Sequence, residues 1–497
     1  MQNTRDKNYT EWYQEVISGA DMAENSPVRG CMVIKPWGYG IWERIKTILD
    51  RRIQETGHEN CYFPLFIPLS FFVKEAKHVE GFAKEMALVT HSRVRIDGTE
   101  VKLEGELEEP LVVRPTSETI IADSFSRWIK SYRDLPVLVN QWANVVRMEM
   151  RPRMFLRTTE FLWQEGHTAH ATAAEALAEA KTMFDVYVEL ATGPMAMPVV
   201  TGEKIETERF PGAVATYTFE AMMQDGKALQ AGTSHFLGQS FAKAADIKFQ
   251  NKEGGLEHVY TTSWGVSTRL IGALIMTHSD DDGLRLPPAI APSQIVIVPI
   301  LKDEKDTAAV MAFCEKLKSL LIGKVALGEG LRVKIDTRDR KSQDKRWDWI
   351  KKGAPLVVEI GPRDMEKGEV CVVNRMNIKE KQFLKLESFA EGAADQLETM
   401  QKDLYAQALS YRDKNTRTDI KDFAEFKAYF GKKADFLPKG GAGFVRAYWC
   451  GDPESLKVLD EMAVTVRCIP FEQNPKPGIC VLTGKAATQE VIFGRSY

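Results

Sequence analysis

Residues 144–167, NVVRMEMRPRMFLRTTEFLWQEGH, decide how this chain folds and what it can bind. An apolar run ends in Arg147 and Glu149, a polar turn follows, and the chain returns to Arg157, Phe161 and Glu165. We expect a β-hairpin whose paired strands fix arginines at both ends. Arginine offers a planar fork to phosphate oxygens, so this pattern indicates a polyphosphate site. A surface hairpin with solvated arginines is the alternative, but the order Arg-x-Glu, turn, Arg-x-x-x-Phe favours the phosphate site.

Length and composition indicate a globular protein of about three domains. The chain has 497 residues, and a domain typically takes roughly 150. Hydrophobic residues make up 44% and charged residues 27%, and no long polar-free run predicts a membrane-spanning helix. The first residues lack the apolar core of a secretory signal, so we expect a cytoplasmic protein. Seven scattered cysteines, an odd number, favour reduced thiols.

The first part of the chain reads as a mostly antiparallel α+β domain. Prolines 64 and 68 suit an edge strand, so the apolar run 60–68 is expected to border an interface. The turn-like start at 115–118, where Thr and Ser can cap and Glu favours the first turn, predicts a helix to about residue 132. Further predicted elements are helices over 35–57, 172–191 and 267–278, strands over 111–114, 197–201, 214–224 and 228–231, and the hairpin over 142–168.

A second part begins after a cluster of prolines at 286–292. Apolar strands at 294–300, 331–335, 355–360 and 369–374 alternate with helices at 303–322 and 342–352. This alternation predicts a compact α/β domain with parallel strands. A charged helix over 384–412 is expected to lead to a last segment, 420–497.

Several short sequence motifs indicate a resemblance to a known family. With Gly265-x-x-x-Arg269 added to the hairpin, the chain resembles the class II aminoacyl-tRNA synthetases, and within them the prolyl-tRNA synthetases of the archaeal and eukaryotic type. The three motifs of the class fit residues 37–64, 147–165 and 265–276. The words that carry the closer resemblance are RPTSET (114–119), FLRT (155–158), EFLWQEGH (160–167), GTSH (232–235) and FGRSY (493–497).

The resemblance covers essentially the whole chain and implies its organisation. Residues 1–288 would form a class II antiparallel-sheet catalytic domain, 289–405 an α/β anticodon-binding domain, and 406–497 a small C-terminal α+β domain. It implies a homodimeric proline–tRNA ligase that joins L-proline to tRNA(Pro) through an adenylate, with ATP as substrate and Mg²⁺ as cofactor. Because the carboxylate of proline is ionised at pH 7, this step needs positioning and charge neutralisation rather than a general base.

The resemblance also implies which residues bind the nucleotide. Arg147 would contact the α-phosphate and the proline carboxylate, while Arg157 and Arg269 would hold the outer phosphates. Phe161 would stack on adenine, with Arg269 covering its other face. Glu149 would hold either the adenine amino group or a Mg²⁺ ion, and the sequence leaves both open. The remaining members of the expected ATP site are Thr158, Gln230, Thr233 and Ser267.

The expected proline pocket combines an anionic group with an apolar enclosure. Glu118 would supply charge and Thr116 a hydroxyl to the secondary ammonium. The residues expected to line the ring are Phe82, Trp163, Glu165 and His235. Since an apolar pocket discriminates one methylene by only ~1–3 kcal/mol, alanine or cysteine could be misactivated. The residues between the second and third motifs are needed for the catalytic fold itself. We therefore expect no editing domain within this chain.

A basic stretch is expected to meet the anticodon. Residues 338–352 hold seven Lys or Arg against three Asp, with Trp347 and Trp349 between them. Basic side chains would contact phosphate, and exposed aromatic rings can stack on unpaired bases. The candidates for contacts with the anticodon are Arg346, Glu359 and Arg363. For each single residue, a solvated helix face is an equal alternative.

The C-terminal segment departs from the family's pattern. The subfamily often carries a four-cysteine zinc site there, but the partner expected after Cys450 is Ser455, and after Cys480 it is Thr483. Because a structural zinc needs four protein ligands, two cysteines do not suffice. We expect that the zinc has been lost and that no metal is bound by this segment. The matching Tyr497 predicts that the C-terminal end still reaches the catalytic domain.

Two other functions fit parts of the sequence. Threonine, serine and glycine synthetases share the three motifs, although the words of the proline pocket argue against them. A non-catalytic relative that binds tRNA or a partner is the second alternative, but such proteins tend to lose motif arginines, and all three are present here.

The loss of zinc is directly testable. Metal analysis of the purified full chain should find far less than one zinc per chain, because only Cys450 and Cys480 occupy plausible ligand positions. A content near one zinc per chain would refute the expectation.

Overall fold

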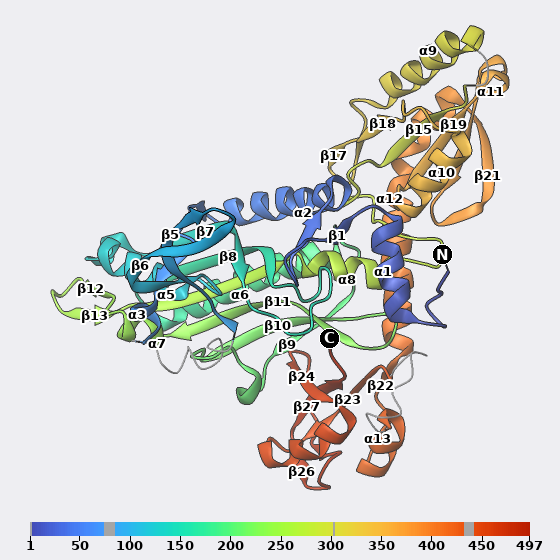
Figure 1. Cartoon of the computed structure of the whole chain (residues 1–497). Helices are drawn as coiled ribbons and strands as arrows, with labels where there is room; N and C mark the ends of the chain where they lie inside the picture. Colours follow the sequence, from blue (N-terminus) through green and yellow to red (C-terminus); the bar gives the residue numbers. More distant parts are fainter. Residues whose placement is uncertain (1, 74–84, 302–303, 432–441) are drawn as a thin grey trace.

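The computed structural model describes residues 2–73, 85–301, 304–431 and 442–497 (Figure 1). Three units are arranged around one long helix, α12 (Leu386–Lys414). An α/β unit lies at one end of α12, the C-terminal unit at the other, and the large central unit beside it. In the described residues no helix has both the length and the apolar character needed to cross a membrane.

One 11-stranded sheet runs through the central and C-terminal units. Neighbouring strands are antiparallel except for the pairs at its two edges, β3 with β7 and β22 with β23. The predicted antiparallel α+β architecture is therefore confirmed. In spatial order the strands are β22 (Thr416–Arg417), β23 (Phe444–Trp449), β27 (Gln489–Gly494), β24 (Thr465–Pro470), β9 (Val199–Glu203), β10 (Ala215–Met222), β11 (Ala228–Gly238), β14 (Tyr260–Ser267), β8 (Glu160–His170), β7 (Val137–Val146) and β3 (Glu59–Asn60).

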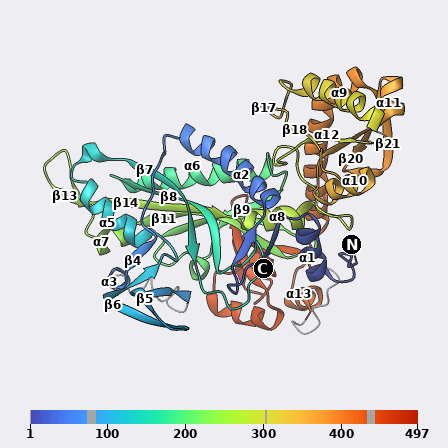
Figure 2. The same ribbon diagram turned by 45° about the horizontal axis from the view of Figure 1, so that its top comes forward.

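Helix α6 (Ala173–Thr192) covers one face of the central strands, and α2 (Pro36–Glu55) packs outside it (Figure 2). Thr172 and Glu175 form a capping box that starts α6, which satisfies two backbone donors at its first turn. Its buried face of alanines, methionines and aromatics joins the main core. The helices predicted from the sequence are confirmed. They are α2, α6, α5 (Glu118–Trp128) and α8 (Arg269–His278).

The structure corrects the expected strands near the N-terminal end. Instead of one strand over 60–68 there are two short ones, β3 and β4 (Phe66–Pro68), because the proline at 64 interrupts the pairing. The short strand expected at 111–114 is the end of β6 (Glu100–Val113), which forms a hairpin with β5 (Ala87–Asp97). This hairpin was missed because its alternating charged and apolar residues are mostly exposed on both faces.

Three local expectations also change. The strands β7 and β8 confirm the hairpin, but residues 147–159 form a long connection, so Arg147 and Arg157 lie outside the paired strands. The sequence 232–235, expected as a turn, lies inside β11. Ser117 stands at the start of α5 without capping it, because its hydroxyl donates to Glu165 instead.

The α/β unit contains a five-stranded sheet in the order β18-β15-β19-β20-β21. The predicted parallel strands are confirmed for β18 (Val333–Ile335), β15 (Ile295–Pro299) and β19 (Leu356–Ile360). The last two, β20 (Glu369–Asn374) and β21 (Asn377–Lys385), are antiparallel, and β21 was not predicted because most of its residues are exposed and polar. The helices α9 (Glu304–Leu321) and α10 (Ser342–Lys351) match the expected ranges.

A buried ion network joins the C-terminal unit to the central one where β24 pairs with β9. Glu220 on β10 is fully buried, and its carboxylate accepts hydrogen bonds from Lys204 at 2.8 Å and Arg467 at 2.9 Å. Burial alone would raise the pKa of Glu220, but the two cations outweigh it and the pKa is lowered. The C-terminal end confirms its predicted return, since the Tyr497 hydroxyl lies 2.5 Å from Asp225 Oδ2.

Breaking this network should destabilise the chain. We expect Arg467→Met to lower the free energy of unfolding by about 3 kcal/mol, the lower end for a broken buried pair, because Lys204 still neutralises Glu220. Denaturant unfolding measures this. Arg446→Met is the matched control, since its pair with Glu490 is more exposed and should contribute below about 1 kcal/mol. Because the pKa of Glu220 is lowered, the contribution should persist above about pH 4.3 and fade below it. Equal losses in both variants would contradict the network's role.

Candidate active site

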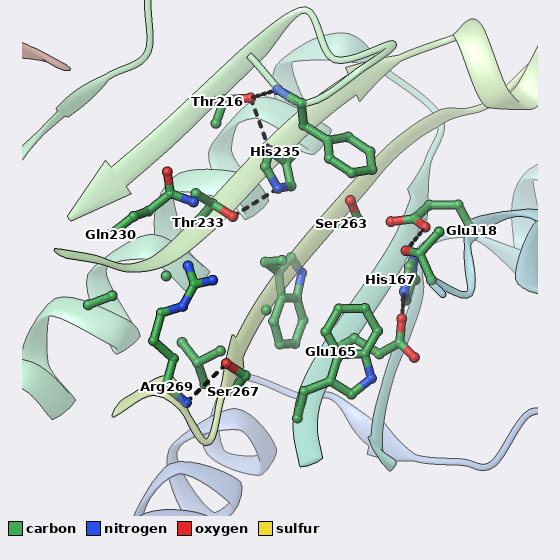
Figure 3. Close-up of a pocket in the computed structure, with 18 of the residues that line it drawn as sticks. Glu118, Glu165, His167, Thr216, Gln230, Thr233, His235, Ser263, Ser267 and Arg269 are labelled. Atoms are coloured by element: carbon green, nitrogen blue, oxygen red, sulfur yellow. Dashed lines mark hydrogen bonds and ion pairs between the residues drawn. The ribbon is translucent and has the colours of Figure 1, made fainter. Parts of the chain in front are cut away.

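A cavity of about 270 Å³ opens over the middle of the central sheet (Figure 3). Its walls come from β8, β11 and β14, with the start of α5 and the N-terminal end of α8 at its sides. The cavity brings together eleven predicted site residues, namely Thr116, Glu118, Arg147, Phe161, Trp163, Glu165, Gln230, Thr233, His235, Ser267 and Arg269.

A second cavity of about 150 Å³ adjoins the first. Arg147, Phe161, Ser267 and Arg269 line both. The second cavity adds the remaining predicted nucleotide residues Glu149, Arg157 and Thr158. Phe82 lies outside the described residues.

Arg147 occupies the boundary between the two cavities. Its backbone N–H donates to the carbonyl of Thr159 at 2.8 Å, and its Nε donates to the carbonyl of Pro115 at 3.0 Å. Its guanidinium lies 5.4 Å from the centre of the Phe161 ring. Burial lowers the pKa of Arg147, but arginine stays charged at neutral pH. The loop is thus pinned to β8 at the point where Arg147 leaves the sheet.

Arg269 begins α8 and faces the same space. Its Nε donates to the carbonyl of Leu156 at 3.1 Å, which fixes the side chain against the loop. Burial, and then the nearby charges of Arg147 and Arg157, lower the pKa of Arg269 to about 10. Such mutual repulsion between neighbouring cations is relieved when an anion binds between them, so the arrangement suits a polyphosphate.

Opposite the arginines, Glu118 and Thr116 form the anionic end of the larger cavity. Both side chains are buried, and the Thr116 hydroxyl donates to the Glu118 carboxylate. Figure 3 shows the Glu118 carboxylate turned into the cavity near Ser263. This end can accept a small cationic group.

Glu165 is held by three side chains. Its Oε1 accepts from Ser117 and Gln141, each at 2.6 Å, and its Oε2 lies 2.8 Å from His167 Nε2. Although burial alone would lower the pKa of His167, the hydrogen bond to Glu165 and the charges of Glu165 and Glu118 raise it. The sequence reasoning missed His167, although the period of two along β8 places it on the same face as Glu165.

His235 is held in a neutral state between two threonines. Its ring nitrogens lie 3.0 Å from the hydroxyls of Thr216 and Thr233 (Figure 3). Burial lowers the pKa of His235 to about 4. The ring of Phe210 packs against it with centroids 4.7 Å apart. Thr216 and Phe210 were also missed, since neither stands in a recognisable sequence word.

The floor of the cavity is aromatic and depends on one glycine. Trp264 is buried on β14, directly beside Gly166 of β8. A Cβ at position 166 would lie 2.0 Å from the indole ring, so only glycine allows the two strands to pair with the indole in this position. Phe161 and Trp163 stand edge to face on the same strand, with centroids 6.1 Å apart.

The predicted anticodon residues prove more enclosed than expected. Trp349 is buried and donates to Asp336, which corrects the expectation of an exposed ring there, whereas Trp347 is partly exposed. Glu359 is also buried and accepts from Lys381 at 2.7 Å and from Arg346 at 3.3 Å. Arg363, at the start of α11 (Pro362–Lys367), is exposed.

Cys450 and Cys480 lie near each other in the C-terminal unit, and the Cys450 thiol is 3.6 Å from the Thr483 hydroxyl. Within the described parts of the chain, no cluster of three or more His, Cys, Asp or Glu is arranged to hold a metal ion. The expected loss of zinc stays a prediction.

The pKa values of His167 and His235 should lie on opposite sides of the ordinary pKa of histidine. We expect histidine-selective NMR to show His167 titrating above pH 6.5 and His235 near pH 4. The His167–Glu165 ion pair should therefore stabilise the fold at low pH and lose its contribution as the pH rises through the raised pKa. His167→Gln assigns the signal, and titration of both histidines near 6.5 would contradict this assignment.

Comparison with protein families matches three regions of the chain. Residues 101–278 match the class II core domain of the tRNA synthetases for G, H, P, S and T. Residues 294–396 match an anticodon-binding domain, and residues 434–497 match the C-terminal domain of prolyl-tRNA synthetases. The class II fold predicted from the sequence is thereby confirmed.

Similar proteins of known name agree along the whole chain. Proline–tRNA ligases of Paramagnetospirillum magneticum and Protochlamydia amoebophila are 59% and 57% identical, and each match covers 99% of this chain and 98% of the relative. These relatives are bacterial, so the archaeal and eukaryotic type is not confirmed.

Solved structures agree as well. Prolyl-tRNA synthetase from Cryptosporidium parvum complexed with halofuginone and AMPPNP superposes with a TM-score of 0.88 at 36% identity, covering 100% of this chain and 96% of that one. The same enzyme complexed with L-proline and AMP gives 0.87 at 35% identity, covering 100% and 97%. With its arginine-lined double cavity and three matching regions, the chain belongs to the prolyl-tRNA synthetases, the proline–tRNA ligases of class II.

Proposed function

We propose that this chain activates L-proline with ATP to prolyl-adenylate and transfers the proline to the 3' end of tRNA(Pro). The observation that carries the proposal is the shared wall between the two cavities. Arg147 stands at that wall, with the anionic pocket of Glu118 on one side and Arg157 on the other. A carboxylate in the first cavity and an α-phosphate entering from the second would meet beside Arg147.

The smaller cavity would hold ATP. Arg157 and Arg269 would neutralise the outer phosphates, Phe161 would stack on adenine, and Thr158 would line the site. Gln230, Thr233 and Ser267 would complete it from the larger cavity. The pKa of Arg269 is lowered by its cationic neighbours, so an incoming triphosphate gains attraction from several charges at once.

The larger cavity would hold proline. Glu118 and Thr116 would bind the secondary ammonium, while Trp163, Glu165 and His235 would enclose the ring. A neutral His235 suits this task, because a charged imidazolium would repel the ammonium. Since Glu165 is occupied by Ser117, Gln141 and His167, its role would be to keep the wall rigid rather than to bind the ammonium. Phe82 remains a proposed pocket residue on sequence alone.

Two carboxylates fit the Mg²⁺ that the family implies. Glu85 and Glu149 line the smaller cavity beside the arginines, and Mg²⁺ typically binds through one or two carboxylates plus substrate phosphates. The ion would supply neutralisation of phosphate charge when bound. Glu149 also accepts from the backbone N–H of Arg151 at 2.9 Å, which holds its carboxylate in the loop.

We further propose the archaeal and eukaryotic type of organisation, with catalytic, anticodon-binding and C-terminal domains at 1–288, 289–405 and 406–497. The full-length match to the Cryptosporidium parvum enzyme, a eukaryotic protein, supports this type. The anticodon would meet the face of exposed Arg363 and Trp347, with Arg346 and Glu359 acting as a paired unit. Translation takes place in the cytoplasm, where we place the enzyme.

Amino-acid-dependent ATP–pyrophosphate exchange tests the proposal. The wild-type chain should exchange strongly with proline, weakly with alanine or cysteine, and not with threonine, serine or glycine. Strong exchange with threonine and none with proline would overturn it.

Arg147→Ala tests the assignment at the reacting phosphorus. Because Arg147 would stabilise charge that develops in the transition state, its loss should lower the rate of exchange about 10²–10³-fold. Arg151→Ala, in the same loop, is the control and should retain near-normal exchange, because Arg151 lines neither cavity. Near-normal exchange in Arg147→Ala would make the assignment wrong.

The chain should also form a homodimer. Tyr62 and Phe66, in the first class motif and the strand that follows, are large aromatic residues that are 69% and 45% exposed, which suits an interface. Light scattering at micromolar concentration should give twice the chain mass, and Tyr62→Glu should shift the population toward monomer. A wild-type monomer under these conditions would remove the claim.

A further inference from the structure

A cavity of about 160 Å³ lies away from the proposed active site, where three parts of the chain meet. The N-terminal segment contributes Arg5, and the C-terminal end of α8 contributes Thr277 and Ser279. Helix α12 contributes Gln407 and Tyr411. Figure 1 shows α12 passing beside α1 (Tyr9–Gly19), with the end of α8 close by. A ligand in this cavity would touch the N-terminal segment, the catalytic unit and the long connecting helix together.

Three hydrogen-bond donors in the cavity wall lack an acceptor. The hydroxyls of Ser279 and Thr277 and the Nε of Arg285 are buried and have no hydrogen-bond partner among the described residues. Ser279 is 0% exposed. A buried donor without a partner costs roughly 1–3 kcal/mol, so three at one cavity are a large penalty unless an acceptor binds there.

The charges around the cavity do not balance. The pKa of Arg285 is lowered, first by burial and then by Arg375 and Arg5, although Asp280 opposes the shift. Asp280 is held by Arg375 through two hydrogen bonds of 2.8 and 2.6 Å, and it lies 3.9 Å from Arg285. Asp281 accepts from Arg5. Among the residues that line the cavity, Arg5 and Arg285 carry positive charge and none is an aspartate or a glutamate.

We propose that this cavity binds a small oxyanion, a phosphate or carboxylate group, between Arg5 and Arg285. The oxygens would accept from Arg285 and from the two hydroxyls, and the negative charge would face the two arginines of the lining. A water molecule needs about 10–15 Å³ of such space, so the cavity has room for a group of several atoms. A cation is excluded by the arginines, and an apolar group would leave the donors without partners.

The two arginines are already oriented for this role. Arg285 donates to the Gln407 amide oxygen at 3.2 Å, and Arg5 donates to the amide oxygen of Gln224. Tyr411 donates to the backbone carbonyl of Gln224 at 2.6 Å. These contacts tie α12 to the cavity wall, so the site would be largely formed before the anion arrives.

Calorimetric titration of the full chain with inorganic phosphate tests the proposal. The catalytic cavities are first saturated with L-proline and a non-hydrolysable ATP analogue, whose triphosphate also occupies the site of Arg157 and Arg269, so that phosphate cannot bind there. If the analogue itself does not bind, that result counts against the proposed function. Phosphate binding between Arg5 and Arg285 is then tested by comparing the phosphate affinity of the wild-type chain with that of the variants described below. We expect one saturable phosphate site per chain, together with a phosphate-dependent rise in the melting midpoint.

Two variants and one control separate the anion site from ordinary water. Arg285→Gln should abolish saturable binding. Ser279→Ala should weaken phosphate affinity about tenfold without lowering the melting midpoint in phosphate-free buffer, because it removes a donor that lacks a partner. Lys402→Gln removes an exposed positive charge from the same helix and should leave phosphate binding unchanged.

Acetate distinguishes the two oxyanions. Competition between acetate and phosphate would assign the site to carboxylates as well, and no competition would restrict it to phosphate. Absence of saturable binding by either anion, or equal affinity in wild type, Arg285→Gln and Ser279→Ala, would show that the cavity holds ordered water only and would overturn the proposal.

Discussion

The pairing of β8 with β7 on one side and β14 on the other is the constraint on which the site depends. Side chains along a strand alternate between faces, so Phe161, Trp163, Glu165 and His167 share one face of the sheet. A slip of one residue would turn all four away together. Trp264 packs against Gly166, where a Cβ would collide with the indole. A slip that placed a residue other than glycine opposite Trp264 is therefore disfavoured.

The site brings positively charged side chains close together. Arg147 and Arg269 lie near each other, and the Nε of each donates to a backbone carbonyl, that of Pro115 and that of Leu156 respectively. A backbone carbonyl fixes the orientation of a guanidinium without neutralising its charge. Glu118 provides negative charge across the cavity from the arginines.

The sequence predicted most of this arrangement, and the reasons for its failures are physical. Helices α2, α6 and α8 and the strands around Phe161 were recoverable because burial imposes a clear period. The β5–β6 hairpin was not, since both its faces are largely exposed. The role of Trp349 depends on its contact with Asp336, 13 positions earlier, and Glu165, the partner of His167, is fixed by Ser117 and Gln141, which are distant in sequence. Such contacts leave no local spacing to read.

The sheet shared by the central and C-terminal units ties the order of synthesis to the completion of the fold. Strand β24 pairs with β9, and the Tyr497 hydroxyl meets Asp225, 272 positions earlier in the sequence. A fourth cavity of about 190 Å³ is lined by Arg269 and Gln230 together with Ser496 and Tyr497. Until residues 489–497 have been synthesised and folded, this cavity lacks the wall formed by Ser496 and Tyr497.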